Sequence, residues 1–169
     1  FIVSVADIIG GLVSNSLALI SDALHNLGDT SALFIAYLAH TISKKEYTDK
    51  KTYGYKRIEI LAALFNAIVL AVIIVYLFVE AFHRLRNPEP VNSLIMLIVA
   101  MIGFLANLIS VLLLKKHSGK NINIRAAYLH LLGDTISSVV VIATALLIYF
   151  FDLYWIDPLV TFLLGIYLL

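Results

Sequence analysis

One short motif occurs twice and places a histidine and an aspartate four residues apart. The first copy, LHNLGDT, covers residues 24–30, and the second, LHLLGDT, covers residues 129–135, with six of seven positions identical. Residues four apart lie one turn from each other on the same face of an α-helix, so each copy presents an imidazole and a carboxylate together. The side chains predicted to share a partner are His25, Asp29, His130 and Asp134.

The surroundings of both motifs are apolar. The chain of 169 residues is 62% hydrophobic, and its mean hydropathy of +0.98 is far above that of a water-soluble domain. An ionisable side chain at the centre of a bilayer costs about 2.5–3.5 kcal/mol on insertion scales, so four of them require a common partner. Because the chain has no cysteine, a metal partner would be held by nitrogen and oxygen donors alone.

The hydropathy pattern predicts an all-α membrane protein, a bundle of six transmembrane helices in one transmembrane domain that covers residues 1–169. The expected helices cover residues 1–12, 17–42, 58–82, 93–114, 123–151 and 157–169. A span takes about 20 residues, so we expect the first and last helices to be truncated. Asp157 followed by Pro158 is typical of an N-cap and the first helical position, which predicts the start of the sixth helix.

The basic residues predict the orientation of the bundle. Ten of the twelve lysines and arginines lie in two segments, 43–57 and 115–125, and the positive-inside rule places such loops in the cytoplasm. Six crossings would also leave both termini there. The two helices that carry the motif are separated by an odd number of crossings, so they run in opposite directions. This predicts a 3+3 inverted repeat with its binding site at mid-membrane.

Antiparallel packing of the two motif helices would gather two nitrogens and two oxygens around one point. Zn²⁺ favours such a four-coordinate tetrahedral set, and Co²⁺ is its common mimic, whereas Mg²⁺ takes octahedral oxygen ligands and Cu(I) prefers sulfur. Gly28 and Gly133, each next to the aspartate of its motif, are expected to let the two helices approach closely. The predicted cargo is therefore Zn²⁺, with no organic cofactor.

Four segments between residues 14 and 138 resemble the cation diffusion facilitator family, the zinc-type transporters that exchange a divalent metal for protons. They are SNSLALISDALHNLGD, TYGYKRIEILAAL, EAFHRLRNPEPV and AAYLHLLGDTISS, in the family's order. The resemblance implies that the histidine and aspartate of both motifs are the ligands of an intramembrane zinc site, and that Zn²⁺ leaves the cytoplasm in exchange for H⁺. It also implies a homodimer in the full-length protein, whose cytoplasmic C-terminal domain is absent from this chain.

Two departures from the family pattern affect the number of metal sites. Some members have extra histidines before the third helix that form a secondary zinc site, but the corresponding positions here are Lys51 and Tyr55. The basic segment after the fourth helix has one histidine, His117, where some relatives have a long His-rich run. We therefore expect one tight zinc site per protomer.

Other interpretations of the motif are weaker. An intramembrane zinc hydrolase would need a vacant coordination position and a general base, but HExxH is absent and both motif aspartates are used as ligands. A non-transporting metal or haem bundle is a further alternative, although di-iron bundles use Glu and Glu-x-x-His. The pairs could also be structural hydrogen bonds between helices, but their repetition favours a functional role. We expect a transporter and not an enzyme, with a metal ion, protons and the lipid bilayer as partners and no nucleic acid.

Several polar residues in the apolar segments fit two roles. Asp7, Asn66 and Asn107 could line the metal path or form hydrogen bonds between helices. Asp22 fits either a helix cap or a guide for the metal near the outer mouth. The sequence leaves these roles open, together with the choice among zinc, cobalt, cadmium and other metals.

Overall fold

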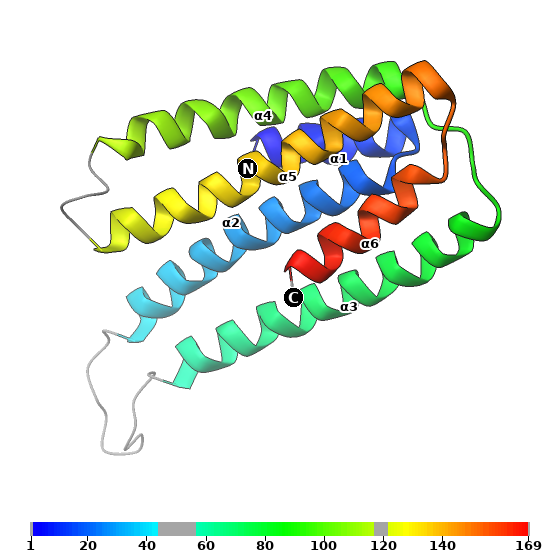
Figure 1. Cartoon of the computed structure of the whole chain (residues 1–169). Helices are drawn as coiled ribbons and strands as arrows, with labels where there is room; N and C mark the ends of the chain where they lie inside the picture. Colours follow the sequence, from blue (N-terminus) through cyan, green and yellow to red (C-terminus); the bar gives the residue numbers. More distant parts are fainter. Residues whose placement is uncertain (1, 44–56, 117–121, 169) are drawn as a thin grey trace.

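The computed structural model describes residues 2–43, 57–116 and 122–168, and within these ranges it contains six α-helices and no strand (Figure 1). The helices are α1 (Ile2–Ser14), α2 (Leu17–Ser43), α3 (Arg57–Arg86), α4 (Ser93–Lys115), α5 (Ile122–Phe151) and α6 (Ile156–Leu168). The predicted all-α membrane bundle is confirmed. In the part of the chain described here, α3, α4 and α5 are long and apolar enough to cross a membrane.

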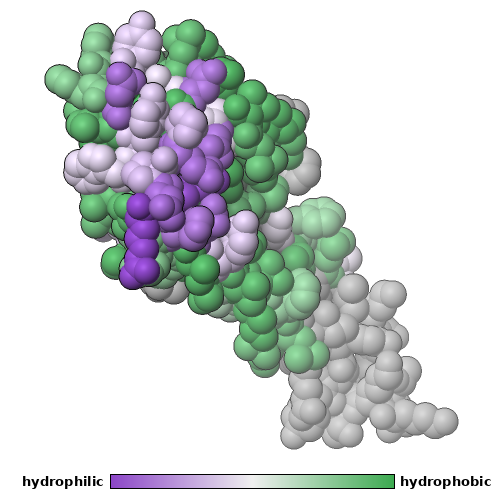
Figure 2. Space-filling view, turned by 90° about the vertical axis from the view of Figure 1, so that its right-hand side faces the viewer, coloured by the Kyte–Doolittle hydropathy of each residue, from purple (hydrophilic) through white to green (hydrophobic). Residues whose placement is uncertain are grey.

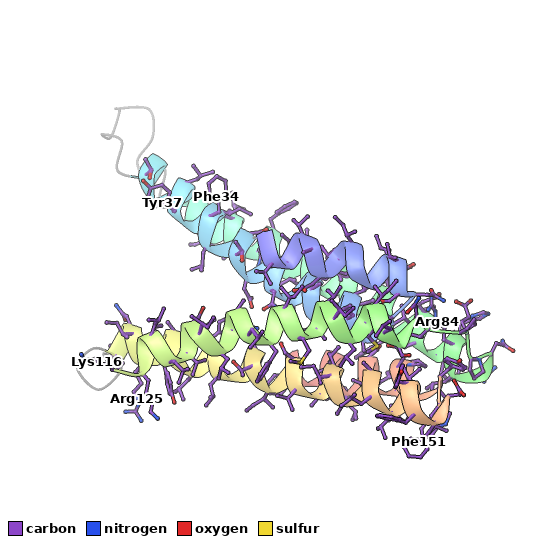
Figure 3. All side chains as sticks on the ribbon, turned by 90° about the horizontal axis from the view of Figure 1, so that it is seen from above. Phe34, Tyr37, Arg84, Lys116, Arg125 and Phe151 are labelled. Carbon is purple, nitrogen blue, oxygen red and sulfur yellow. The ribbon has the colours of Figure 1, made fainter. Side chains whose placement is uncertain are left out.

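The bundle has two different ends. The short connections, residues 15–16, 87–92 and 152–155, lie together at one end, which we call the turn end (Figure 1). The opposite end, the loop end, is where α2 and α4 end and where α3 and α5 begin. Helix α2 runs from the turn end to the loop end and α5 runs the other way, as expected for an inverted repeat. Seen from above, α2 and α3 diverge from α4 and α5 toward the loop end (Figure 3).

The hydrophobic core lies in the turn-end half. Its largest cluster joins α2, α4, α5 and α6 through residues that are almost fully buried: Ala18, Leu19, Met96, Ala100, Val141, Ala145, Ile148, Val160 and Leu164. In the loop-end half of α2, by contrast, Leu33 and Phe34 are 75% and 62% exposed. Apolar side chains exposed in this way are suited to lipid contact. The turn-end half is therefore tightly packed, and the loop-end half is open.

The first turn of α2 is completed by a residue of α6. The Asp157 carboxylate accepts hydrogen bonds from the backbone amides of Leu17, at 2.7 Å, and Ala18, at 3.3 Å, and from the Ser16 hydroxyl. Ser16 Oγ in turn accepts from the amide of Leu19, so three amides that lack intrahelical partners are satisfied. The expectation that Asp157 caps its own helix is wrong: α6 already begins at Ile156, and the carboxylate lies at the positive end of α2.

Helix α3 continues four residues beyond its predicted end at residue 82. Glu80 and Arg84, one turn apart, form an ion pair of 2.9 Å that supports this last turn. Pro88 and Pro90 then prevent further helix. Arg84 also donates to the backbone oxygen of Asn15 at 2.9 Å, which joins α3 to the α1–α2 connection.

The connections at the turn end are joined by hydrogen bonds. The Asn15 side chain donates to Glu89 at 3.0 Å and to the backbone oxygen of Pro90 at 3.3 Å. The backbone amide of Asn92 donates to the oxygen of Ser14 at 2.8 Å. Figure 2 shows this end of the molecule, where a hydrophilic band is surrounded by hydrophobic sides. The turn end thus combines a polar surface with the packed core beneath it.

Candidate metal centre

The two copies of the motif meet between α2 and α5. Asp29 Oδ2 lies 3.2 Å from His25 Nε2 on its own helix and 3.1 Å from His130 Nε2 on α5. Asp134 has the same relation to both rings, with Oδ1 3.8 Å from His25 Nε2 and Oδ2 3.7 Å from His130 Nε2. Each imidazole therefore contacts both carboxylates, and the four side chains form a closed ring of alternating nitrogen and oxygen.

The threonine that ends each copy of the motif has a local structural role. The Thr30 hydroxyl donates to the backbone oxygen of Asn26 at 2.9 Å, and the Thr135 hydroxyl donates to that of Leu131 at 2.7 Å. Such bonds to the preceding turn satisfy a hydroxyl that would otherwise lack a partner in apolar surroundings. The repeated sequence thus forms the same local structure in both helices, even though the helices run in opposite directions.

The four donors contact one another directly. Among the described residues, no group of three or more His, Cys, Asp or Glu side chains has the arrangement of a ready metal site. The distances are nevertheless suitable, because Zn–N and Zn–O bonds of about 2.0 Å place the donors of a tetrahedron about 3.3 Å apart. The nitrogen–oxygen distances of 3.1 to 3.8 Å bracket that value. Small side-chain rotations would therefore accommodate a tetrahedral cation.

One oxygen in the ring lacks a partner. Asp29 Oδ2 is inaccessible to solvent and has no hydrogen-bond donor, although it lies between the two imidazole nitrogens. A buried anionic oxygen without a donor is costly, so such an atom requires either a proton on a neighbouring nitrogen or a bound cation. The donor chemistry therefore fits a site that alternates between protons and a metal.

The glycine in each motif does not pack where the sequence suggested. A Cβ on Gly28 would lie 2.4 Å from Leu70 Cδ2 of α3, and one on Gly133 would lie 2.6 Å from the Tyr167 hydroxyl of α6. The expectation that these glycines bring α2 and α5 together is therefore wrong. Adjacent helical residues point about 100° apart, so a glycine next to an inward-facing aspartate faces a different neighbour. The two glycines admit α3 and α6 instead.

A cavity of about 290 Å³ reaches the ring from one side. It lies between α1, α2, α4 and α5, and its lining includes Asp29, His130 and Asp134 together with polar residues. The His130 side chain is 50% exposed, whereas that of Asp134 is only 8% exposed. Asn107 lines this cavity, which answers one of the questions left by the sequence, but neither Asp7 nor Asn66 does. The ring is therefore accessible through the open half of the bundle.

Sequence reasoning missed a second link between α2 and α5. The Ser137 hydroxyl donates to Asp22 Oδ1, and both side chains are buried. Asp22 precedes His25 by three residues and Ser137 follows Asp134 by three, so each lies on the site-facing side of its helix, close to one turn nearer the turn end. This symmetric spacing around the two motifs is the sequence feature that could have predicted the bond. The bond itself shows that Asp22 connects α2 to α5 and is not a helix cap.

The predicted features in the basic segments lie outside the described residues. Lys51, Tyr55 and His117 are among them, because residues 44–56 and 117–121 are not described. The absence of a secondary zinc site therefore stays a prediction.

Comparison with known proteins gives a consistent result. A family model described as the cation efflux transmembrane domain matches residues 1–169. The metal cation efflux system protein CzcD of Cupriavidus metallidurans is 42% identical over 98% of this chain and 52% of its own length. The zinc transporter ZitB of Pectobacterium atrosepticum is 44% identical over 95% of the chain and 51% of its own length. A cadmium, cobalt and zinc/H(+)-K(+) antiporter of Bacillus subtilis is 41% identical over 98% of the chain and 54% of its own length. The chain spans about half the length of these curated relatives.

Proposed function

The chain belongs to the cation efflux family, and we propose on that premise that it forms the transport pathway of a Zn²⁺ exporter that exchanges the metal for protons. His25, Asp29, His130 and Asp134 are the proposed ligands. The observation that carries this assignment is the closed ring in which both imidazoles contact both carboxylates. Co²⁺ and other divalent transition metals are proposed as additional cargo, in line with the names of the relatives.

Charge balance supports an exchange of metal for protons. Two carboxylates and two neutral imidazoles around Zn²⁺ carry no net charge, and neither do two carboxylates beside two imidazolium rings. Both forms are tolerable in a low-dielectric setting, whereas the empty dianionic site is costly. Metal binding requires neutral imidazoles and ionised carboxylates, so arriving Zn²⁺ displaces protons. An inward proton gradient would therefore drive zinc export.

The proposed direction of entry follows from the open end. The 290 Å³ cavity reaches the ring between helices that diverge toward the loop end. Segments 43–57 and 115–125, which follow α2 and α4 in the sequence, are basic, and the positive-inside rule therefore favours a cytoplasmic position for this end. We infer that the cavity admits Zn²⁺ from the cytoplasm. The homodimer remains part of the proposal on the family resemblance alone. Membership of a transporter family argues against an intramembrane hydrolase.

Flux measurements in liposomes test the proposal. Reconstituted protein should move Zn²⁺ in response to an imposed pH gradient at zero membrane potential, with protons moving the other way. Asp134→Asn should weaken zinc binding by at least tenfold, or about 1.4 kcal/mol, because it removes an anionic ligand. Asp152→Asn changes the same chemical group at an exposed position and is the matched control. Zinc flux that ignores pH on both sides, or normal flux in Asp134→Asn, would rule out this mechanism.

A further inference from the structure

The bond between Asp22 and Ser137 lies on the turn-end side of the metal-binding ring. We propose that this pair is the gate that closes the site on that side, and that its opening releases the cation. The inference rests on the proposed transport function and adds two residues that are not ligands. The pair directly joins α2 and α5, the two helices that hold the ligands.

Burial differs sharply on the two sides of the ring. Toward the loop end, the cavity of about 290 Å³ touches Asp29, His130 and Asp134. Toward the turn end, Asp22 and Ser137 are 6% and 5% exposed. Beyond them, Ala18 of α2 and Val141 of α5 are fully buried in the main hydrophobic cluster. A cation in the ring therefore has a way back to the loop end. A smaller cavity of about 130 Å³ between α2 and α3 also touches His25 and Asp29, but its lining is otherwise almost entirely apolar and does not suit a cation. Between α2 and α5, the helices must separate at Asp22 and Ser137 before a cation can pass.

The acceptor in this bond suits the passage of a cation. Asp22 interacts electrostatically with Asp7 of α1 and with Asp134 of the ring. Asp7 is itself 3% exposed, and its Oδ1 has no hydrogen-bond partner. Separation of α2 from α5 would remove the Ser137 hydroxyl from Asp22 and leave a free carboxylate beside the ring. Separation of α2 from α5 would thus both open a path toward the turn end and expose the Asp22 carboxyl oxygens to a cation on that path.

The strength of the bond also suits a gate. A buried side-chain hydrogen bond shifts an equilibrium by about twofold to tenfold. This is enough to keep the site closed for most of the time, and differential binding of a cation to the open form can reverse it. A purely structural bond would change stability when removed without changing which side of the site is accessible, and this difference can be measured.

Thiol labelling from the turn-end side tests the gate. The chain has no cysteine, so Val141→Cys gives a single reporter one turn beyond Ser137 on α5. Ser137→Ala should raise the rate of labelling by a membrane-impermeant reagent about twofold to tenfold. Ser138→Ala is the matched control. Ser138 is also buried, and its hydroxyl, like that of Ser137, is within hydrogen-bond distance of the backbone oxygen of Asp134, whereas the bond to Asp22 of α2 belongs to Ser137. Equal labelling in the two variants would overturn the proposal.

Two further variants separate gating from a general loss of structure. Asp22→Asn and Ser137→Thr both keep an acceptor and a donor, so each should leave the reporter protected. Labelling of either variant as fast as Ser137→Ala would contradict the gate. Conversely, an oxidative cross-link in Asp22→Cys/Ser137→Cys should stop zinc flux, and reduction should restore it. Unchanged flux after cross-linking would also overturn the proposal. The labelling needs no zinc, so it decides on the gate even if the protein without substitutions shows no zinc flux.

Discussion

Replacing Asp157 with alanine should destabilise the bundle by about 2–6 kcal/mol. The substitution leaves two buried amides, those of Leu17 and Ala18, without the carboxylate that now accepts from them. An unsatisfied buried donor costs about 1–3 kcal/mol, which gives this range for the pair. The Ser16 hydroxyl can rotate toward another acceptor, so it adds little. The side chain of Asp157 is fully buried, so water cannot replace the lost acceptor.

Asp157→Asn should cost about half as much, because one oxygen remains and only the bond to Leu17 is lost. Equilibrium unfolding in mixed micelles measures both changes. Asp152→Asn is the control: Asp152 is exposed with φ 53°, a conformation that asparagine tolerates, and the change should stay within about 0.5 kcal/mol. If Asp157→Ala were no more destabilising than this control, α6 would not complete the first turn of α2.

Three further predictions concern other parts of the molecule. Zinc titration of the purified chain should give one tight site, and two independent tight sites would contradict this expectation. Gly11→Ala should destabilise by about 1–3 kcal/mol in the same unfolding assay, because its Cβ would lie 2.6 Å from Ile20 Cγ1 and 3.1 Å from the Ile20 backbone nitrogen; an unchanged midpoint would contradict this packing. The hydrogen bond from Asn15, and then the charge of Arg84, hold the pKa of Glu89 below its usual value, so its stabilising contribution is present above the unfolded pKa and is lost as pH falls through the folded pKa. Glu89→Gln should therefore lower stability at pH 7 and have no effect at pH 2, and an equal effect at both values would exclude the charge as the cause.

The sequence predicted the helices because these depend on local periodicity, and it predicted the meeting of the two motifs because the motif is repeated in helices that run in opposite directions. His25 and Asp29 share a helix face wherever that helix packs, and the repeated motif indicated a second face of the same kind. The cross-helix distances then followed from antiparallel packing, which the count of crossings had already predicted. The meeting of the motifs also required α2 and α5 to touch, which was assumed from the repeat and which the contacts between the two helices confirm.

The errors concern residues whose partners are distant in sequence. Asp157 followed by proline is a normal helix start, and nothing near it in sequence reveals that its carboxylate reaches Leu17 of α2. Gly28 and Gly133 were assigned to the wrong neighbours because small residues indicate a close contact without indicating with which helix. The bond between Asp22 and Ser137 was missed because its two residues lie 115 positions apart in the sequence.

The three-helix repeat has a consequence for how such a chain could arise. A unit with an odd number of crossings, duplicated in tandem, places its second copy upside down, and the motif then meets its copy in the antiparallel arrangement that α2 and α5 show. An ancestral unit able to insert in either direction would carry no strong charge bias. In this chain the connection after the first motif helix, residues 43–57, holds six lysines and arginines, whereas its counterpart, residues 152–155, reads DLYW and holds none. The two halves share the motif while their connections differ, so under the positive-inside rule the orientation of each half would be encoded in the segments between helices and not in the motif.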